Sequence, residues 1–183
     1  CLCLALAPAL QAQPTPAEAQ DLRDEAMLRV GTFMRYVEII SCRNEDQFDA
    51  EIKQMAIERA LVLFKPEAMV EFTTTQKGSS RSYDLEEYLH LLKDDIDRGK
   101  EYFFDVFPLR PDNLRPVPGS DHLSAGITSV YNCRYYYDKT GQPHAEYVDK
   151  ENHRKLQEIV VKKQDFPTGS RYSILLGNIS VRE

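Results

Sequence analysis

Glu71 is the side chain in this 183-residue sequence that we select as a candidate general base. It lies in Ala68–Thr75, a run rich in Val, Phe and Thr that predicts a short strand. A carboxylate half-buried by such a strand would have a raised pKa, as a base working near neutral pH requires. Tyr36, in a predicted helix, could face the same space and is a candidate for the wall of a ligand pocket.

The sequence contains no phosphate-binding loop or nucleophile elbow, so we lean toward a protein that is not an enzyme.

Gly126–Tyr137 is the longest strand-like run, and its alternation directs Tyr131, Cys133, Tyr135 and Tyr137 to one face. The hydroxyl groups of these tyrosines could orient a polar group of a ligand, which makes the three of them further pocket candidates. The alternative is that they are core and edge aromatics whose hydroxyl groups reach water.

The four histidines lie at positions 90, 122, 144 and 153, without the spacing of a metal site. His90 and Asp94 are four residues apart on a predicted helix and could hydrogen-bond, most simply as a surface pair. We expect no metal and no cofactor.

Cys1–Ala12 is apolar, too short to span a bilayer, and ends in Leu-Gln-Ala before polar Gln13. These are features of the apolar region and cleavage site of a secretory signal peptide, so we expect an exported protein, periplasmic or extracellular. The alternatives are an apolar N-terminal helix, or lipidation at or upstream of this segment. If the segment is removed, Cys42 and Cys133 remain, and they form either a disulfide or two free thiols.

The net charge of −6 and the pI near 5.3 argue against general nucleic-acid binding, because such surfaces need clustered Lys and Arg. No run is long and apolar enough to predict a membrane span. We divide the chain into a residual signal (1–12), a lead segment (13–19) and one domain (20–183).

Apolar spacing predicts three helices. The first runs from about Pro16 to Cys42 behind a Thr15 and Glu18 capping box. The second starts near an Asn44 cap, carries a stripe that includes Phe48, Met55 and Leu63, and stops before Pro66. The third follows Asp84 and ends near Gly99.

The strand-like runs after these helices are Tyr102–Phe107, Gly126–Tyr137, Lys155–Lys163 and Arg171–Val181. Four prolines within Pro108–His122 predict a loop or an irregular edge there. Helices followed by a meander indicate an α+β fold with the helices on one face of a curved antiparallel sheet.

This layout resembles the nuclear transport factor 2-like superfamily, the cone shared with ketosteroid isomerases and polyketide-cyclase-like proteins. The resemblance is carried by the pattern of Glu58–Phe72, Asp84–Arg98, Tyr131–Gly141 and Tyr172–Val181. It implies a pocket between the helices and the concave sheet face, and often a homodimer through the outer face. Enzymes of this group use an acid with a Tyr or a second acid, or an Asp–His pair, but neither set can be matched position by position here.

Three functions therefore compete. The first is an exported module that binds a small molecule or a protein. The second is an acid–base lyase or isomerase of the ketosteroid-isomerase or dehydratase type. The third is a structural component of a cell-envelope assembly.

Overall fold

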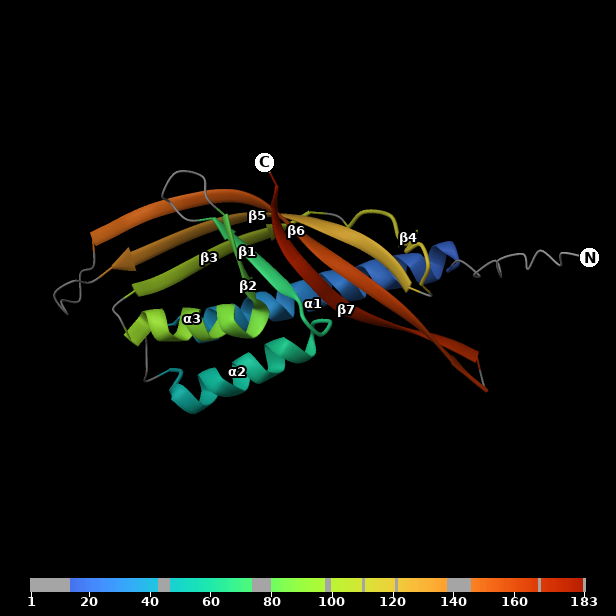
Figure 1. The fold of residues 1–183 in the computed structure, drawn as a ribbon, viewed down its shortest axis with the longest axis horizontal. Coiled ribbons are helices and arrows are strands. Elements are labelled where there is room, and N and C mark those ends of the chain that lie inside the picture. The colour runs from blue at the N-terminus through green and yellow to red at the C-terminus, as the bar shows by residue number, and fades with distance from the viewer. Residues whose placement is uncertain are drawn as a thin grey trace, which may run out of the picture.

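The computed structural model describes residues 14–42, 47–73, 80–97, 100–109, 111–120, 122–137, 146–167 and 169–182. Within these ranges the chain forms an α+β fold, with three helices on one side of a long, curved sheet (Figure 1). The predicted α+β class is confirmed by this arrangement.

Helix α1 (Pro16–Ser41) begins as the sequence predicts. The Thr15 side chain accepts a hydrogen bond from the Glu18 backbone N–H, and the Glu18 carboxylate accepts one from the Thr15 N–H at 2.8 Å. This capping box satisfies N–H groups that the first turn leaves without helical partners. Its buried side comprises Leu22, Ala26, Val30, Phe33, Met34, Val37, Ile40 and Ser41.

Helix α2 (Ala50–Val62) begins at a different cap from the one predicted. Residues 43–46, including Asn44, lie outside the described residues, and the Asp49 carboxylate accepts a hydrogen bond from the Ile52 N–H at 2.8 Å. Met55, predicted to be in the core stripe, is exposed, whereas Lys53 is buried beside Ala56 and Ala60. Packing selects this face because the apolar residues of α2 form no single dominant stripe.

Helix α3 (Leu85–Asp97) is capped by Asp84, as predicted. The Asp84 carboxylate accepts hydrogen bonds from the N–H groups of Glu86 and Glu87, at 2.9 and 3.5 Å. Leu85, Leu89 and Leu92 are buried and attach the helix to the core. Among the described helices, none combines the length and apolar character that crossing a membrane requires.

The sheet has the strand order β2-β1-β7-β6-β5-β3, with β4 paired to β5. Its strands are β1 (Met69–Thr73), β2 (Ser80–Asp84), β3 (Lys100–Pro108), β4 (Arg115–Pro116), β5 (His122–Tyr137), β6 (Glu146–Phe166) and β7 (Gly169–Arg182). The sheet is mostly antiparallel, as predicted, but β1 runs parallel to the C-terminal strand β7, which the sequence did not predict. Strand β2 was not predicted, and short β4 occupies the stretch expected to be a loop or irregular edge.

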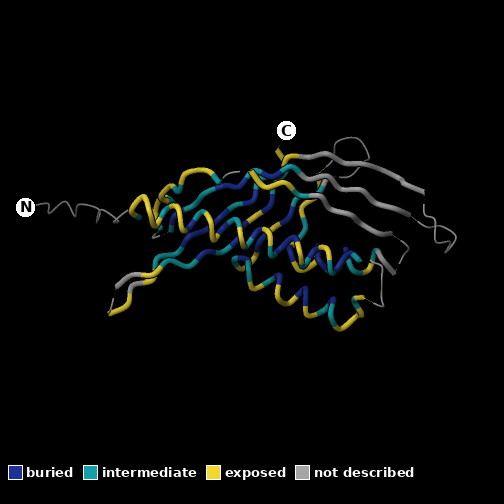
Figure 2. Tube along the Cα trace, turned by 180° about the vertical axis from the view of Figure 1, so that it is seen from behind, coloured by how far each residue is buried: buried dark blue, intermediate teal, exposed yellow. Residues whose placement is uncertain are grey.

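Figure 1 shows the long strands β5, β6 and β7 arching over the helices. Buried residues gather where these strands cross the helices, and the outward sides of the helices are exposed (Figure 2). One core cluster contains residues of all three helices and of strands β1, β5, β6 and β7. Within it, the rings of Phe33 and Phe64 meet edge to face with centroids 4.8 Å apart. We call the helix-covered side of the sheet the inner face.

A register shift interrupts the pairing of β6 with β7. Gln157 pairs with Ile179 and Ile159 pairs with Leu176, so Gly177 and Asn178 together stand opposite Glu158. Two residues opposite one is the arrangement of a β-bulge, which bends and twists the strand that contains it. The bulge thus contributes to the curvature of the sheet in its middle.

Candidate functional site

Among the described residues of the sheet, three polar side chains are buried on the inner face, where the core is otherwise mostly apolar. Ser129 on β5 pairs in register with Lys155 on β6, and the next pair on the same face is Ile127 with Gln157. Their exposed fractions are 0% for Ser129, 5% for Lys155 and 1% for Gln157. We call Ser129, Lys155 and Gln157 the polar row. Because buried polar groups normally have partners, the hydrogen bonds of this row decide what it can do.

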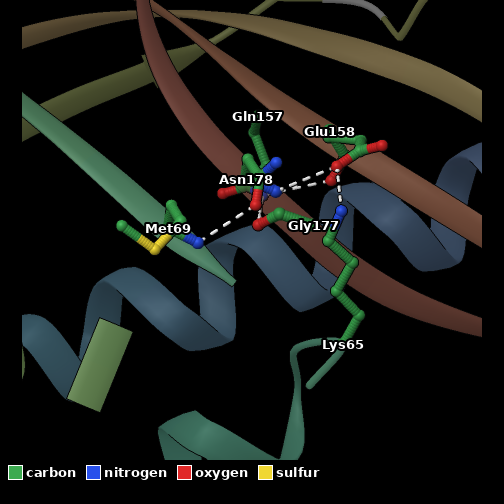
Figure 3. Close-up of polar contacts among 6 residues, drawn as sticks. All are labelled: Lys65, Met69, Gln157, Glu158, Gly177 and Asn178. Carbon is green, nitrogen blue, oxygen red and sulfur yellow. Dashed lines mark hydrogen bonds and ion pairs between the residues drawn. The ribbon is translucent and has the colours of Figure 1, made fainter. Parts of the chain in front are cut away.

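Only the Nε2 group of the Gln157 amide has hydrogen-bond partners among the described residues. Its Nε2 donates to the carbonyl oxygens of Gly177 and Glu158, both at 3.1 Å, and so satisfies backbone groups at the bulge (Figure 3). These two bonds fix the orientation of the amide, and its Oε1 has no hydrogen-bond partner among the described residues. Ser129 Oγ likewise has none among them. Leaving a buried polar atom unpaired costs roughly 1–3 kcal/mol.

Lys155 brings a positive charge to the same row. Its Nζ lies 5.1 Å from the centroid of the Phe72 ring on β1, within the range of a cation–π contact. The Phe72 ring in turn lies 6.2 Å from the ring of Tyr88 on α3. One aromatic ring, that of Phe72, therefore lies against the polar row, and the Tyr88 ring packs near Phe72.

Glu71, the predicted base, is half-buried on β1 and bonded to its surroundings. A hydrogen bond from the Ser80 side chain and one from the Val181 N–H, the latter 2.9 Å long, together lower the pKa of Glu71. Burial acts in the opposite direction but is outweighed, and the charge of Lys155 adds to the lowering. The expectation of a raised pKa is wrong, because the carboxylate accepts bonds that favour its charged form. Whether Glu71 acts in catalysis stays a prediction.

The predicted pocket tyrosines fall into two groups. Tyr36 is partly buried on α1 and packs against the core. Tyr131, Tyr135 and Tyr137 lie in β5, where the backbone is described and their side chains lie outside the description. In register, Tyr131 stands two positions beyond Ser129 and pairs with His153 of β6, so the tyrosine positions follow Ser129 along β5.

The remaining sequence candidates show no common site. Cys42 is a free, half-buried cysteine, and the side chain of Cys133 lies outside the described residues, so the choice between a disulfide and two free thiols stays a prediction. His90 is half-buried on α3, whereas Asp94 is exposed. In the described part of the chain, no group of three or more His, Cys, Asp or Glu residues is placed to hold a metal ion.

A polar network joins β6 and β7 to the α2–β1 connection at the bulge (Figure 3). Lys65 Nζ contacts Glu158 Oε2 at 2.7 Å, and the same oxygen accepts a hydrogen bond from the Asn178 N–H at 3.1 Å. Asn178 Oδ1 accepts one from the Met69 N–H at 3.0 Å, which attaches the start of β1 to β7. Burial, the largest single influence, would raise the pKa of Glu158, but the Lys65 and Asn178 bonds and the Lys65 charge together lower it.

An open surface pocket of about 290 Å³ lies beside this network, between the α2–β1 connection and the start of α3. Apolar Leu61, Phe64 and Leu85 line it together with the carboxylates of Glu67 and Asp84. Asp84 already caps α3. The pocket therefore lies where α2, β1 and α3 meet, and none of the three residues of the polar row lines it.

Sequence reasoning missed the polar row. Within the predicted strand Lys155–Lys163, the inward positions of Ile159 and Val161 extend by alternation to Gln157 and Lys155. The sequence signal for the row was that Lys155 and Gln157 alternate in step with two core residues. This alternation did not lead us to predict their burial, because Lys and Gln on a strand are usually exposed.

No protein-family model matches the sequence, and no curated protein matches it either. Among solved structures, the chain is similar to one described as a "putative dehydratase" from the NTF2-like family of Streptomyces avermitilis. The two are 13% identical with a TM-score of 0.42, and the match covers 88% of this chain and 96% of that chain. In this chain itself, helices on one face of a curved sheet form the layout that the resemblance to the nuclear transport factor 2-like superfamily predicted.

Proposed function

We propose that this chain is an exported module that binds a small molecule at the polar row, between the helices and the inner face of the sheet. The observation that carries the proposal is that two buried atoms of this row, Ser129 Oγ and Gln157 Oε1, have no hydrogen-bond partner among the described residues and lie beside the buried Lys155. Export rests on the signal-like segment Cys1–Ala12, which lies outside the described residues.

Energetics support a binding role for these atoms. A ligand group that pairs one of them would recover roughly 1–3 kcal/mol, or about 5- to 150-fold in affinity. The aromatic ring of Phe72, near Lys155, would supply apolar contact. Because all three residues of the row are buried, a ligand would enter only when the helices move away from the sheet.

Binding accounts for these observations better than acid–base catalysis does. A general base should have a pKa near the working pH, whereas hydrogen bonds lower the pKa of Glu71. Both bonded neighbours of that carboxylate, Ser80 and Val181, belong to strands, which suits a structural role in joining β2, β1 and β7. The lyase or isomerase alternative would need another base.

A second candidate function is protein contact through the outer face of the sheet. Phe107 on β3 is 57% exposed and pairs with Val130, which alternates with inward-facing Ser129. Leu109, two residues further on, is 49% exposed and donates its N–H to the Thr128 carbonyl oxygen. A homodimer or an envelope assembly would use this apolar area, and replacing Phe107 with Ser would then weaken the association measured by sedimentation.

The binding proposal is tested by a thermal-shift screen of metabolite classes on the protein and on Ser129→Ala. A ligand at about 100 times its Kd should stabilise the protein by roughly 2.7 kcal/mol. The shift should shrink in Ser129→Ala and persist in Thr128→Val, a control on the neighbouring residue of the same strand. A ligand whose shift is equal in both variants would place binding elsewhere, and the absence of any shift would contradict the proposal.

A further inference from the structure

We propose that the open pocket of about 290 Å³ between the α2–β1 connection and the start of α3 binds a small organic cation, a primary ammonium group on a short apolar stem. This site is separate from the polar row, because no residue of that row lines it. Three features of the pocket carry the proposal: an apolar floor, an acidic rim and a lysine whose charge is already matched.

The floor of the pocket is apolar and is built from three parts of the fold. Phe64 and Ala68 of the α2–β1 connection and Leu85 of α3 are buried core residues that line the pocket. Leu61 of α2 is partly buried, and Pro66 completes the apolar lining. Ligand pockets are usually about 300 Å³ or larger, so a pocket of this volume suits a small ligand with one compact apolar group.

The rim of the pocket is acidic. Glu67, Asp84 and Glu86 line it, and all three are exposed. Asp84 caps α3 through its Oδ1 atom, which accepts both N–H groups, so Oδ2 takes part in neither bond. Three carboxylates around one apolar hollow attract a cation and repel an anion.

The cation among the lining residues is already matched. Lys65 Nζ contacts Glu158 Oε2 on β6 at 2.7 Å (Figure 3), and Glu158 does not line the pocket. Within the described part of the chain, no ion pair involves Glu67, Asp84 or Glu86. The rim therefore keeps a net negative charge that a cationic ligand would complement.

Glu67 is the rim residue that local structure explains least. Asp84 and Glu86 stand at the start of α3, where acidic side chains stabilise a helix whatever else they do. Glu67 lies in the turn between α2 and β1 with a φ of 57°, in the left-handed region that favours glycine over glutamate. The turn itself thus gives no reason for a carboxylate at this position.

Four probes separate the floor from the rim: phenethylamine, 2-phenylethanol, which lacks the charge, ethylamine, which lacks the ring, and 3-phenylpropionate, which has the opposite charge. Each is titrated into the isotope-labelled protein while NMR follows the backbone amide signals. Phenethylamine should shift the signals of Phe64, Glu67 and Leu85 saturably and bind most tightly. The alcohol should bind about 1.5- to 5-fold more weakly for each carboxylate that contacts the ammonium group. Ethylamine should also bind more weakly, because it covers less of the apolar floor.

Three results would each overturn the proposal. Equal affinity for phenethylamine and 2-phenylethanol, or tighter binding of 3-phenylpropionate, would show that the acidic rim does not select the ligand. Equal affinity for phenethylamine and ethylamine would show that the floor takes no part. The absence of saturable shifts, or shifts only at amides away from the pocket, would show that the pocket is not a binding site for amines.

Variants assign the preference for a cation to Glu67. Glu67→Gln keeps the length of the side chain and removes its charge, so it should bind phenethylamine about 1.5- to 5-fold more weakly and 2-phenylethanol equally well. Glu51→Gln is the matched control, because this exposed glutamate lies at the other end of α2 from the pocket, and it should change neither affinity.

Glu67→Gly separates binding from folding. It relieves the left-handed backbone, so it should unfold at an equal or higher temperature than the unaltered protein while it binds the amine as weakly as Glu67→Gln. If both variants bind phenethylamine as tightly as the unaltered protein does, the charge of Glu67 is not used and the proposal is wrong.

Discussion

Glu158 on β6 lies directly against Gly177 on β7. A Cβ atom added at position 177 would lie 2.7 Å from the Glu158 Cδ and 2.9 Å from its Cβ. This close approach occurs at the bulge, where the same glutamate contacts Lys65 and Gly177 accepts a hydrogen bond from Gln157. The absence of a side chain at position 177 thus allows the network that joins β6, β7 and the α2–β1 connection.

Gly177→Ala should destabilise the protein by about 1–3 kcal/mol, because the new methyl group displaces Glu158 in a packed region. Gly31→Ala is the matched control, since nothing lies within 4 Å of a Cβ at that helical position. It should stabilise the protein by roughly 0.5–1 kcal/mol through helix propensity. Urea unfolding of both variants checks this, and equal effects would contradict the account of the bulge.

Acid should weaken the fold in part through Glu158. Its pKa in the folded protein is below the ordinary value of 4.5, so its charged form contributes stability above that pH and loses the contribution as the pH falls through the lowered pKa. Glu158→Gln should therefore be less stable than the unaltered protein at pH 7, and the difference should shrink below pH 4.5. Thermal unfolding across this range measures it, and a difference independent of pH would rule out the ion pair as its source.

Ser129→Ala should stabilise the protein by about 1 kcal/mol or more, because it removes a buried hydroxyl group that has no partner among the described residues. Ser120→Ala is a suitable contrast. Its hydroxyl accepts a hydrogen bond from the His122 N–H at 3.1 Å and donates to the Val117 carbonyl at 3.3 Å, so its loss should destabilise the protein. Denaturant unfolding compares the two, and a destabilised Ser129→Ala would show that the hydroxyl group is paired in solution.

Glu71→Ala should lower stability by about 0.5–1.5 kcal/mol at pH 7, because the Val181 N–H loses its carboxylate acceptor. Glu71→Gln keeps an acceptor oxygen and should lose less. Hydrogen exchange of the Val181 amide should accelerate in the alanine variant more than in the glutamine variant. Equal exchange in all three proteins would mean that this hydrogen bond does not hold β1 against β7.

The helices follow largely from local sequence. The Thr15 and Glu18 capping box and the Asp84 cap lie within a few residues of the groups they satisfy, so their patterns could be read before the structure was known. The second helix was placed less well. Its true cap, Asp49, competes with Asn44 in the sequence, and packing against its neighbours decides which side of α2 is buried.

The candidate site could be predicted only in part. The alternation of β5 predicted that three of its tyrosines share a face with Cys133. The alternation of β6 places Lys155 and Gln157 in line with core residues, but it does not by itself show that these two polar side chains are buried. Burial of a Lys or Gln depends on which elements cover the strand, and these come from distant parts of the chain. Glu71 shows the same dependence, since its pKa is lowered by Ser80 and Val181, the latter 110 residues away.

The sequence by itself determined the α+β class, the three helices with two of their caps, and the approximate positions of the long strands, because each depends on periodicity and on contacts within a few residues. The tertiary structure alone decided the parallel pairing of β1 with β7, the bulge at Gly177 and the burial of the polar row. Each of these brings together residues far apart in the chain. Pairing of that kind is selected by the packing of the whole sheet against the helices, which no local pattern encodes.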